Sequence, residues 1–528
     1  MQQQKSIIYL DKEPFTPELL KKLQEGNYAI DFTEETYNNI QKNREVFEEF
    51  TKKTDKHWSG VNSGLGFFSD VWVDNKDVEE MQYNIIKSHS AGVGEPLKPE
   101  QVRILFVTRI KNLSMGYSGL SLPTFKSYVK AFNLDILPLI PSQGTVGASG
   151  DLAPLAHLAL GLIGEGQIYD TQTNQFRESK AILAQKGYSP LKLKQKEGLS
   201  LINGNEFIAA ISAEALIKAE NIAKHADLIF SVTFEALNGV QNAFHPKCHE
   251  IRNHAGQKET AERIRSLIQE NGKPSELNQE LKKKLNRVQD GYSIRCVPQV
   301  HGITHDTLKF IRKLVTNELN AITDNPMIFT EKDGEQYKGG TLIRAGNFHG
   351  EYGAKSMDFL AIAIHELSNI SERRIERLVN PSLSKLPAFL TKTPGKSCGF
   401  MMAHVTAVSL VSENKSLCHP ASVDSIPTNA NKEDHVSMGG YAARKALQVI
   451  NNVQHVLAIE LLLACQALSF HEIGKPHPKI QKIHEIVREY VPYVEEDKPL
   501  APFMESIMNL INSGKLLEVA QFEEKHEY

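Results

Sequence analysis

Apolar residues recur at helical spacing over most of the chain beyond residue 200. The longest such patterns cover residues 208–237, 304–321, 354–378 and 441–468, and the last contains neither glycine nor proline. Helices in globular proteins average about 11 to 12 residues, so helices of this length indicate a bundle packed side by side. We therefore expect a mainly α protein with a long-helix core.

The chain before residue 200 is more mixed. Its patterns predict a strand near residues 7–10 and helices over residues 76–91 and within residues 97–132. The stretch after residue 476 is polar and predicts short helices. We expect three parts: an N-terminal domain over 1–200, a long-helix bundle over 201–475 and a C-terminal helical tail over 476–528.

One loop of the N-terminal part has unusual chemistry, because Ala148, Ser149 and Gly150 are three small residues in succession. Gly150 lacks a Cβ, so its nitrogen can approach the carbonyl carbon of Ala148 without a clash. Ring closure and dehydration of Ser149 would leave an exocyclic methylidene on an imidazolone, an electrophile that ordinary side chains do not supply. Asp151 is expected to be the N-cap of a following helix, whose positive end would favour negative charge on the ring.

Composition excludes several classes of function. The 528 residues carry a formal net charge of −3 without a long basic tract, which argues against nucleic acid as a partner. The first residues lack an apolar signal core, and the apolar stretch 456–468 contains Glu460 and is too short to span a bilayer. The five scattered cysteines indicate reduced thiols. We expect a cytoplasmic protein that binds neither nucleic acid nor a membrane.

The run GTVGASGDLAPLAHLAL, residues 144–160, resembles the signature of the aromatic amino acid ammonia-lyases. The resemblance extends over roughly residues 55–470. It implies the helical fold of the fumarase/aspartase-like superfamily, a small aromatic amino acid as substrate, and a homotetramer whose active sites combine residues from three subunits. It also implies a 4-methylidene-imidazol-5-one (MIO) group formed from Ala148, Ser149 and Gly150, with no external cofactor.

Other motifs of the same family imply roles for individual residues. The run QDGYSIRCVPQ contains Arg295, whose planar guanidinium can hold a substrate carboxylate. Tyr292 lies three residues earlier, on the same face if the segment is helical, and could move a proton. Gln289 and Asn203 would stabilise the site, Asn203 by donating to developing negative charge beside the ring.

The side-chain pocket is assigned by the same resemblance. His89 lies where the family distinguishes its substrates, and Phe348 would form a wall against an aromatic ring. Asn325 is a candidate substrate contact, although a turn explains it equally well. Glu433 replaces the glutamine of phenylalanine and tyrosine lyases, and a carboxylate there can accept the N–H of an imidazole or move a proton. Glu433 favours histidine as the substrate.

The sequence also departs from the family pattern. Ser59 stands where the family has a tyrosine that serves as an acid–base residue. Glu206 and Lys432 both replace glutamine, and we hypothesise that they pair with each other or recognise a modified substrate. The spacing of His245, Cys248, His249 and His254 fits no standard zinc finger, so no metal is expected.

The function expected from these observations is elimination of ammonia from an aromatic L-amino acid, with L-histidine giving urocanate. Three alternatives use the same scaffold: a tyrosine or phenylalanine ammonia-lyase, a 2,3-aminomutase, and an ergothionase-like lyase that releases trimethylamine from a histidine derivative. A fourth is a degenerate helical scaffold that binds a ligand without catalysis, which Ser59 favours.

Overall fold

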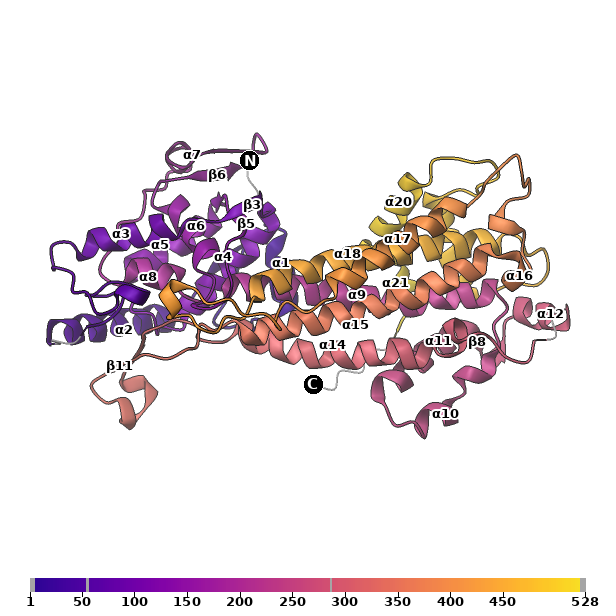
Figure 1. Ribbon diagram of the computed structural model, residues 1–528, viewed down its shortest axis with the longest axis horizontal. Coiled ribbons are helices and arrows are strands. Elements are labelled where there is room, and N and C mark those ends of the chain that lie inside the picture. Colours follow the sequence, from indigo (N-terminus) through magenta and orange to yellow (C-terminus); the bar gives the residue numbers. More distant parts are fainter. Residues whose placement is uncertain (1–4, 54–56, 285–286, 523–528) are drawn as a thin grey trace. The chain divides into compact units, whose positions relative to one another are not determined.

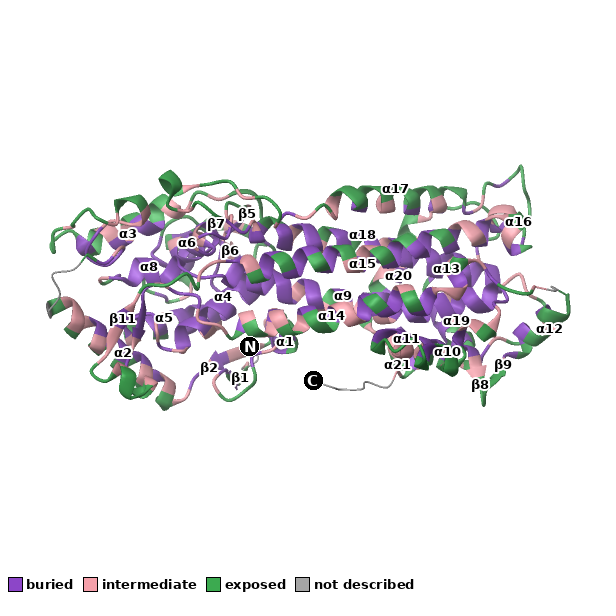
Figure 2. Cartoon of the chain, turned by 60° about the horizontal axis from the view of Figure 1, so that its bottom comes forward, coloured by how far each residue is buried: buried purple, intermediate pink, exposed green. Residues whose placement is uncertain are grey.

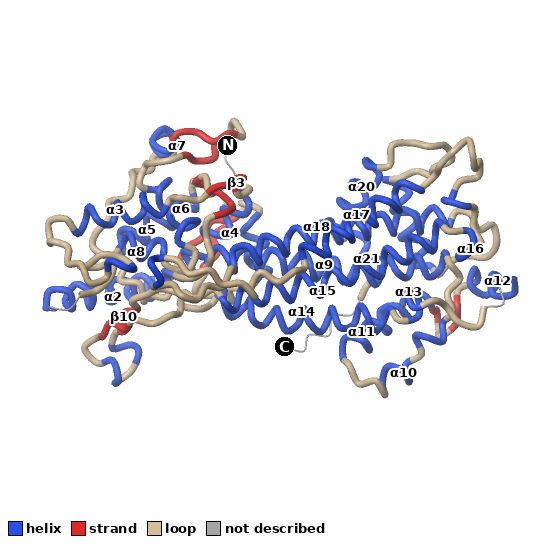
Figure 3. Tube along the Cα trace, viewed as in Figure 1, coloured by secondary structure: helices blue, strands red, loops and turns tan. Residues whose placement is uncertain are grey.

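The structure is a computed structural model that describes residues 5–53, 57–284 and 287–522. Helices dominate the chain, and the strands are short (Figure 3). The expected mainly α fold is therefore confirmed. The chain divides into two compact units (Figure 1). Unit 1 comprises Met1–Ile217, Arg312–Asp358 and Pro420–Arg444, and unit 2 comprises Lys218–Ile311, Phe359–His419 and Lys445–Tyr528.

Four long helices each begin in one unit and end in the other: α9 (Glu206–Ala236), α14 (Val297–Leu319), α15 (Glu351–Val379) and α18 (Gly439–Leu468). They confirm the four long helices predicted from the sequence, with ends that differ by a few residues. The largest difference is the start of α14, where Pro298 lies in the first turn and is tolerated there. Long stretches of α9 and α18 are buried (Figure 2).

The remaining helices of unit 1 are α1 (Pro17–Gln24), α2 (Glu34–Lys53), α3 (Val78–His89), α4 (Pro99–Ser114), α5 (Leu122–Asn133), α6 (Leu152–Leu162), α7 (Ser179–Gln185) and α8 (Glu197–Ile202). The helices α3, α4 and α5 agree with the predictions for residues 76–91 and 97–132. Pro123 lies in the first turn of α5, where proline is tolerated. Those of unit 2 are α10 (Pro246–Glu250), α11 (Ala255–Ile268), α12 (Glu276–Lys284), α13 (Tyr292–Arg295), α16 (Pro381–Ser384), α17 (Met401–Leu417), α19 (Pro478–Tyr490), α20 (Ala501–Ser513) and α21 (Lys515–Ala520).

The strands form small, separate sheets. In unit 1, β1 (Ser6–Tyr9) pairs in parallel with β2 (Tyr28–Asp31), which confirms the strand predicted near residues 7–10. Antiparallel pairs join β3 (Val93–Pro96) to β5 (Pro141–Gln143), β10 (Met327–Phe329) to β11 (Thr341–Ile343), and β6 (Gln167–Asp170) to both β4 (Leu137–Pro138) and β7 (Gln175–Glu178). In unit 2, β8 (Gln269–Glu270) pairs with β9 (Lys273–Pro274). The three-part division at residues 200 and 475 stays a prediction.

Helix α18 is the one helix among the described residues that is long and apolar enough to cross a membrane, with a mean hydropathy of 1.3 in its best window. That window is 78% buried inside the protein, as in an ordinary core helix. Glu460 does not interrupt this helix. Both of its carboxylate oxygens accept bonds from the Arg374 guanidinium of α15, at 2.6 and 2.8 Å, and both side chains are fully buried.

Candidate active site

The Ala148-Ser149-Gly150 loop lies in unit 1, between β5 and α6. Gly150 has a φ of +78°, and a Cβ at this position would lie 2.4 Å from the carbonyl oxygen of Gly204. Only glycine fits such a close approach. The backbone N–H of Asp151 donates to the same Gly204 oxygen at 2.6 Å. The loop is therefore held directly against the turn that follows α8.

Ser149, at the centre of the triad, contacts two of the predicted site residues. Its hydroxyl donates to Oε1 of Glu433 at 2.5 Å, and its carbonyl oxygen accepts from Nδ2 of Asn203 at 3.0 Å. Asn203 is the residue at which α8 ends, and Glu433 lies in the loop before α18. The Thr428 hydroxyl donates to the other carboxylate oxygen of Glu433. The fold thus places the Asn203 amide at the carbonyl oxygen of Ser149 and the Glu433 carboxylate at its hydroxyl.

Segments from elsewhere in the chain hold the residues before the triad. The backbone N–H of Gly350 donates to the Gly147 carbonyl at 2.9 Å, and that of Met438 donates to the Val146 carbonyl at 2.8 Å. The Ser437 hydroxyl contacts both of these carbonyl oxygens, at 3.1 and 3.2 Å. Hydrogen bonds of this kind fix a loop that carries glycine residues and would otherwise be conformationally free.

Asp151 is the N-cap residue of α6, as predicted, but its side chain does not cap that helix. The carboxylate accepts instead from the backbone N–H of Ile208 at 2.9 Å and from the Thr145 hydroxyl at 3.0 Å. The side chain is fully buried, and this burial raises the pKa of Asp151 to about 7. Asp151 therefore links the triad loop to the first turn of α9.

Glu206, at the start of α9, pairs with Arg109 of α4, and the hypothesis that it pairs with Lys432 is wrong. Nη1 of Arg109 donates to Oε1 of Glu206 at 2.7 Å, and the side chains are 0% and 3% exposed. Burial raises the pKa of Glu206, and the nearby Arg109 charge opposes this shift. Lys432 is exposed. A charged residue at the N-terminus of a buried helix finds its partner in the core rather than at the surface.

This ion pair lies directly beneath the turn that contacts the triad. A Cβ on Gly204 would lie 2.4 Å from Oε2 of Glu206 and 2.6 Å from Nη1 of Arg109. The Thr323 hydroxyl donates to Glu206 at 3.2 Å and accepts from the backbone N–H of Asn205 at 3.2 Å. The pair and Thr323 thereby set the path of the turn from Asn203 to Asn205.

The other predicted pocket residues of unit 1 are His89, Phe348 and Asn325. Nδ1 of His89, the last residue of α3, lies 2.7 Å from the Ile85 carbonyl oxygen, so that nitrogen carries the proton in a donated bond. Phe348 is half-buried. Oδ1 of Asn325 accepts from the backbone N–H of Ala345 at 2.9 Å. This contact gives Asn325 a role in holding its own loop.

Tyr292, Arg295 and Gln289 belong to unit 2, so the geometry described for unit 1 does not include them. Tyr292 and Arg295 share one turn, α13, and the guanidinium carbon lies 4.7 Å from the centroid of the Tyr292 ring. This confirms that they lie on one face. Tyr292 is 71% exposed, and Nε of Arg295 is buried without a hydrogen-bond partner among the described residues.

Ser59 occupies a loop of unit 1 that closes on itself. Its hydroxyl donates to the Gly64 carbonyl oxygen at 2.9 Å. A Cβ on the next residue, Gly60, would lie 2.6 Å from Leu199 of α8, so this loop packs closely against the helix that ends at Asn203. The hydroxyl of Ser59 is thus engaged in loop closure.

Sequence reasoning missed Arg109, Thr145 and Ser437. Arg109 carried a usable signal, because it lies in the largely apolar run VRILFVTRI, residues 102–110, and a charged residue within a buried helix needs a buried partner. Thr145 and Ser437 carried none, because the hydrogen bonds of a serine or threonine hydroxyl leave no pattern in a sequence.

The site thus combines a mainly helical fold with a closely held Ala-Ser-Gly loop whose serine hydroxyl donates to a carboxylate. Comparison with known proteins identifies the class of protein that has these features. A family model described as aromatic amino acid lyase matches residues 15–489. The histidine ammonia-lyase of Bos taurus is 48% identical over 513 residues, which are 97% of this chain and 77% of that protein. That of Natranaerobius thermophilus is 43% identical over 97% of this chain and 98% of that protein.

Among solved structures, the crystal structure of histidine ammonia-lyase from Trypanosoma cruzi matches with a TM-score of 0.88 and 42% identity, over 98% of this chain and 95% of that chain. The chain belongs to the aromatic amino acid lyase family. It is a carbon–nitrogen lyase, and the expected fold and enzyme class are confirmed.

Proposed function

We propose that this enzyme eliminates ammonia from L-histidine to give urocanate. The observation that carries the proposal is the 2.5 Å contact between Oε1 of Glu433 and the Ser149 hydroxyl, which puts a carboxylate beside the triad. An imidazole differs from a phenyl ring in its N–H, and a carboxylate is the acceptor that selects for it. The relatives that share 42–48% of this sequence are named histidine ammonia-lyases, which supports the same substrate.

The catalytic group of the proposal is MIO, formed from Ala148, Ser149 and Gly150. The residues fit this group. The backbone of Gly204 leaves no room for a Cβ on Gly150, and the Ser149 hydroxyl, which would be lost as water, donates to Glu433. Once formed, the group supplies an electrophile to the substrate. The Ser149 carbonyl becomes the ring carbonyl, and Nδ2 of Asn203 already donates to it at 3.0 Å. That donor stabilises negative charge on the carbonyl oxygen, as in an oxyanion hole.

The side chains around the triad would orient and deprotonate the substrate. Glu433, held by Thr428, would accept the imidazole N–H or move a proton. His89 has Nδ1 engaged with the Ile85 carbonyl, which leaves Nε2 as an acceptor for a polar group of the substrate. Phe348 would pack against the aromatic ring of the substrate.

The carboxylate of the substrate would be bound by Arg295, with Tyr292 and Gln289 beside it. The buried, unpartnered Nε of Arg295 supports a ligand there, because a buried donor without an acceptor is costly. We propose a homotetramer in which these residues complete a site on another chain, as the family resemblance implies. The large exposed fraction of Tyr292 in the single chain agrees with this arrangement. We also propose that the enzyme works in the cytoplasm.

The test is a substrate panel with purified protein: L-histidine, L-tyrosine, L-phenylalanine and the thiol-histidine betaine that an ergothionase would cleave. We expect ammonia and urocanate from L-histidine, followed by ultraviolet absorbance, and an intact mass short of two waters. Ser149→Ala cannot form the methylidene, so it should be inactive and its mass should not be short of two waters. Ser142→Ala in β5 should keep the activity and the mass deficit of two waters. Turnover of another substrate alone would reject histidine, and an uncyclised, inactive chain would favour a binding scaffold.

A further inference from the structure

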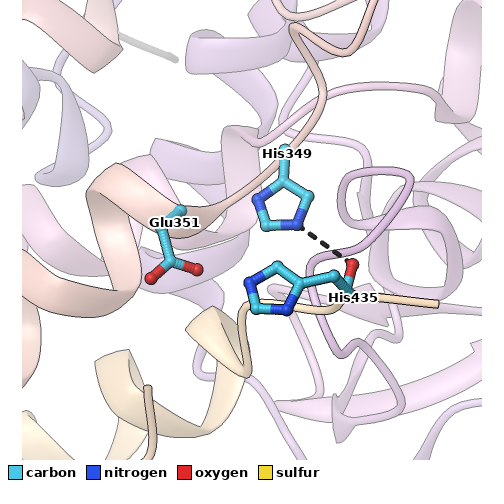
Figure 4. Close-up of side chains that lie close together, drawn as sticks. All are labelled: His349, Glu351 and His435. Carbon is cyan, nitrogen blue, oxygen red and sulfur yellow. Dashed lines mark hydrogen bonds between the residues drawn. The ribbon is translucent and has the colours of Figure 1, made fainter. Parts of the chain in front are cut away.

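Three possible metal ligands converge in unit 1, outside the set of residues with an assigned role. Ring nitrogens of His349 and His435 and a carboxylate oxygen of Glu351 all lie within 4.8 Å of one another (Figure 4). His349 precedes α15, Glu351 is the first residue of α15, and His435 lies in the loop before α18. The two imidazole rings are stacked nearly parallel, with centroids 5.7 Å apart and an interplanar angle of 5°.

The hydrogen bonds of His349 prepare one of its nitrogens for a metal. Its Nε2 lies 3.2 Å from the carbonyl oxygen of His435, so Nε2–H donates there and Nδ1 keeps its lone pair. Ligating histidines characteristically donate their other N–H to a carbonyl or carboxylate in this way. Figure 4 shows the free ring edges of His349 and His435 on the side where the Glu351 carboxylate lies.

We propose that His349, Glu351 and His435 bind a divalent transition metal ion, with Zn²⁺ as the best fit. Two histidines and one glutamate form a characteristic zinc ligand set, with a fourth position left for water. Tetrahedral ligands at about 2.0–2.1 Å from zinc lie roughly 3.3 Å apart, whereas the donor atoms here are only known to lie within 4.8 Å of one another, so the ligands must move closer together. Rotation of His435, whose side chain is exposed, can supply this movement.

Lys355 competes with the metal for the same carboxylate. Its Nζ lies 3.1 Å from Oε1 of Glu351, one turn along α15, and the lysine side chain is 56% exposed. An exposed ion pair of this kind contributes little to stability. A dication with two imidazole ligands outcompetes it, and removal of the lysine charge should strengthen metal binding.

A metal here would join the two segments that hold the triad loop. Gly350, between two of the ligands, donates to the Gly147 carbonyl at 2.9 Å. Ser437, two residues after His435, contacts the Val146 and Gly147 carbonyls. The metal would therefore act as a clamp that stabilises this part of unit 1, and its binding does not depend on the substrate of the enzyme.

The experiment measures metal binding by the full-length protein after removal of metal with a chelator. Zn²⁺ is titrated by calorimetry, Co²⁺ serves as a spectroscopic probe of tetrahedral coordination, and thermal unfolding is followed with and without Zn²⁺. We expect about one Zn²⁺ per chain, tetrahedral Co²⁺ bands and a higher melting temperature. Glu351→Gln and His435→Gln should weaken Zn²⁺ binding at least tenfold, and Lys355→Gln should bind it as tightly or more tightly.

Cys248→Ser is the matched control, because Cys248 belongs to the other histidine- and cysteine-containing segment of the chain and should leave binding unchanged. Circular dichroism without metal shows whether each variant folds. If His435→Gln does not fold, the effect of Glu351→Gln on Zn²⁺ binding tests the proposal by itself. Absence of Zn²⁺ binding by the wild type would overturn the proposal. So would binding that survives Glu351→Gln and His435→Gln but is lost in Cys248→Ser.

Discussion

Arg109 and Glu206 form a buried ion pair, with Nη1 2.7 Å from Oε1, directly under Gly204. Gly204 in turn accepts from the backbone N–H of Asp151 at 2.6 Å. Two charges far from the surface thus support the turn on which the triad loop rests. The desolvation cost of such a pair is offset only while both partners are present.

Arg109→Met should lower the free energy of unfolding by about 3–5 kcal/mol, because it leaves the Glu206 carboxylate buried without its charge partner. Glu206→Gln should be destabilising for the corresponding reason. The double variant should cost less than the sum of the two, since neither charge is then left alone. Urea unfolding of the four proteins measures this coupling.

The control for this cycle is the exposed pair of Lys482 and Glu485, whose side chains are 58% and 49% exposed. Glu485→Gln should change the free energy of unfolding by no more than about 1 kcal/mol. Strict additivity of the two core substitutions would show that Arg109 and Glu206 act independently.

Glu433→Gln should leave the fold intact and lower turnover of L-histidine by about 10²-fold or more, because the amide can no longer take a proton. The amide resembles the residue of phenylalanine and tyrosine lyases, so the ratio of activity on L-histidine to that on L-phenylalanine or L-tyrosine should also fall. Steady-state kinetics on the three amino acids gives this ratio. Asp434→Asn, next to it and exposed, should retain wild-type kinetics. Unchanged turnover in Glu433→Gln would remove the carboxylate from the mechanism.

Asp151 predicts a pH dependence of stability. Its pKa rises from 3.8 to about 7 on folding, because the carboxylate is buried. Between these values the native state holds a proton that the unfolded chain has released, so stability falls as pH rises from about 4 to about 7 and then levels off. Three pKa units correspond to about 4 kcal/mol, which is an upper limit.

Asp151→Asn carries no titrating group, so its stability relative to the wild type should improve as pH rises across this window. Chemical unfolding of both proteins at pH 4, 5.5 and 7.5 separates this slope from the contributions of other carboxylates, which cancel in the difference. A difference that is constant with pH would show that Asp151 ionises in the folded protein with its ordinary pKa.

Ser59→Tyr tests the departure from the family pattern. If Ser59 only lacks a proton-transfer group, the phenol should raise ammonia-lyase turnover, although loss of the hydrogen bond to the Gly64 carbonyl costs about 1 kcal/mol of stability. Ser59→Phe has the same bulk without the hydroxyl and should not raise turnover. Equal turnover in the two variants, or none above wild type, would mean that this enzyme does not use a tyrosine at that position.

Several parts of the site were predictable because they depend on local chemistry. Ala148-Ser149-Gly150 lies within the run GTVGASGDLAPLAHLAL, and this run is recognisable because its residues are consecutive in the sequence. The same holds for α13, where a three-residue spacing puts Tyr292 and Arg295 on one face, and for the long helices with their 3.6-residue period.

Other parts were mispredicted because the partner of a charged or polar side chain lies far away in the sequence. Glu206 was hypothesised to pair with Lys432, but it pairs with Arg109, 97 positions earlier. Asp151 was expected to cap its own helix, but its carboxylate binds the backbone of Ile208, 57 positions later. Burial forces each of these groups to find a partner, and sequence distance sets no limit on which one.

The sequence by itself determined the helical class and the aromatic lyase family, because these follow from residue periodicity and from motifs within short windows. Only the tertiary structure decided that Glu433 and Asn203 meet Ser149, that Arg109 supports the turn beneath it, and that His349, Glu351 and His435 converge. Side chains from distant segments become neighbours through packing of the core, and that packing is a property of the whole chain rather than of any window within it.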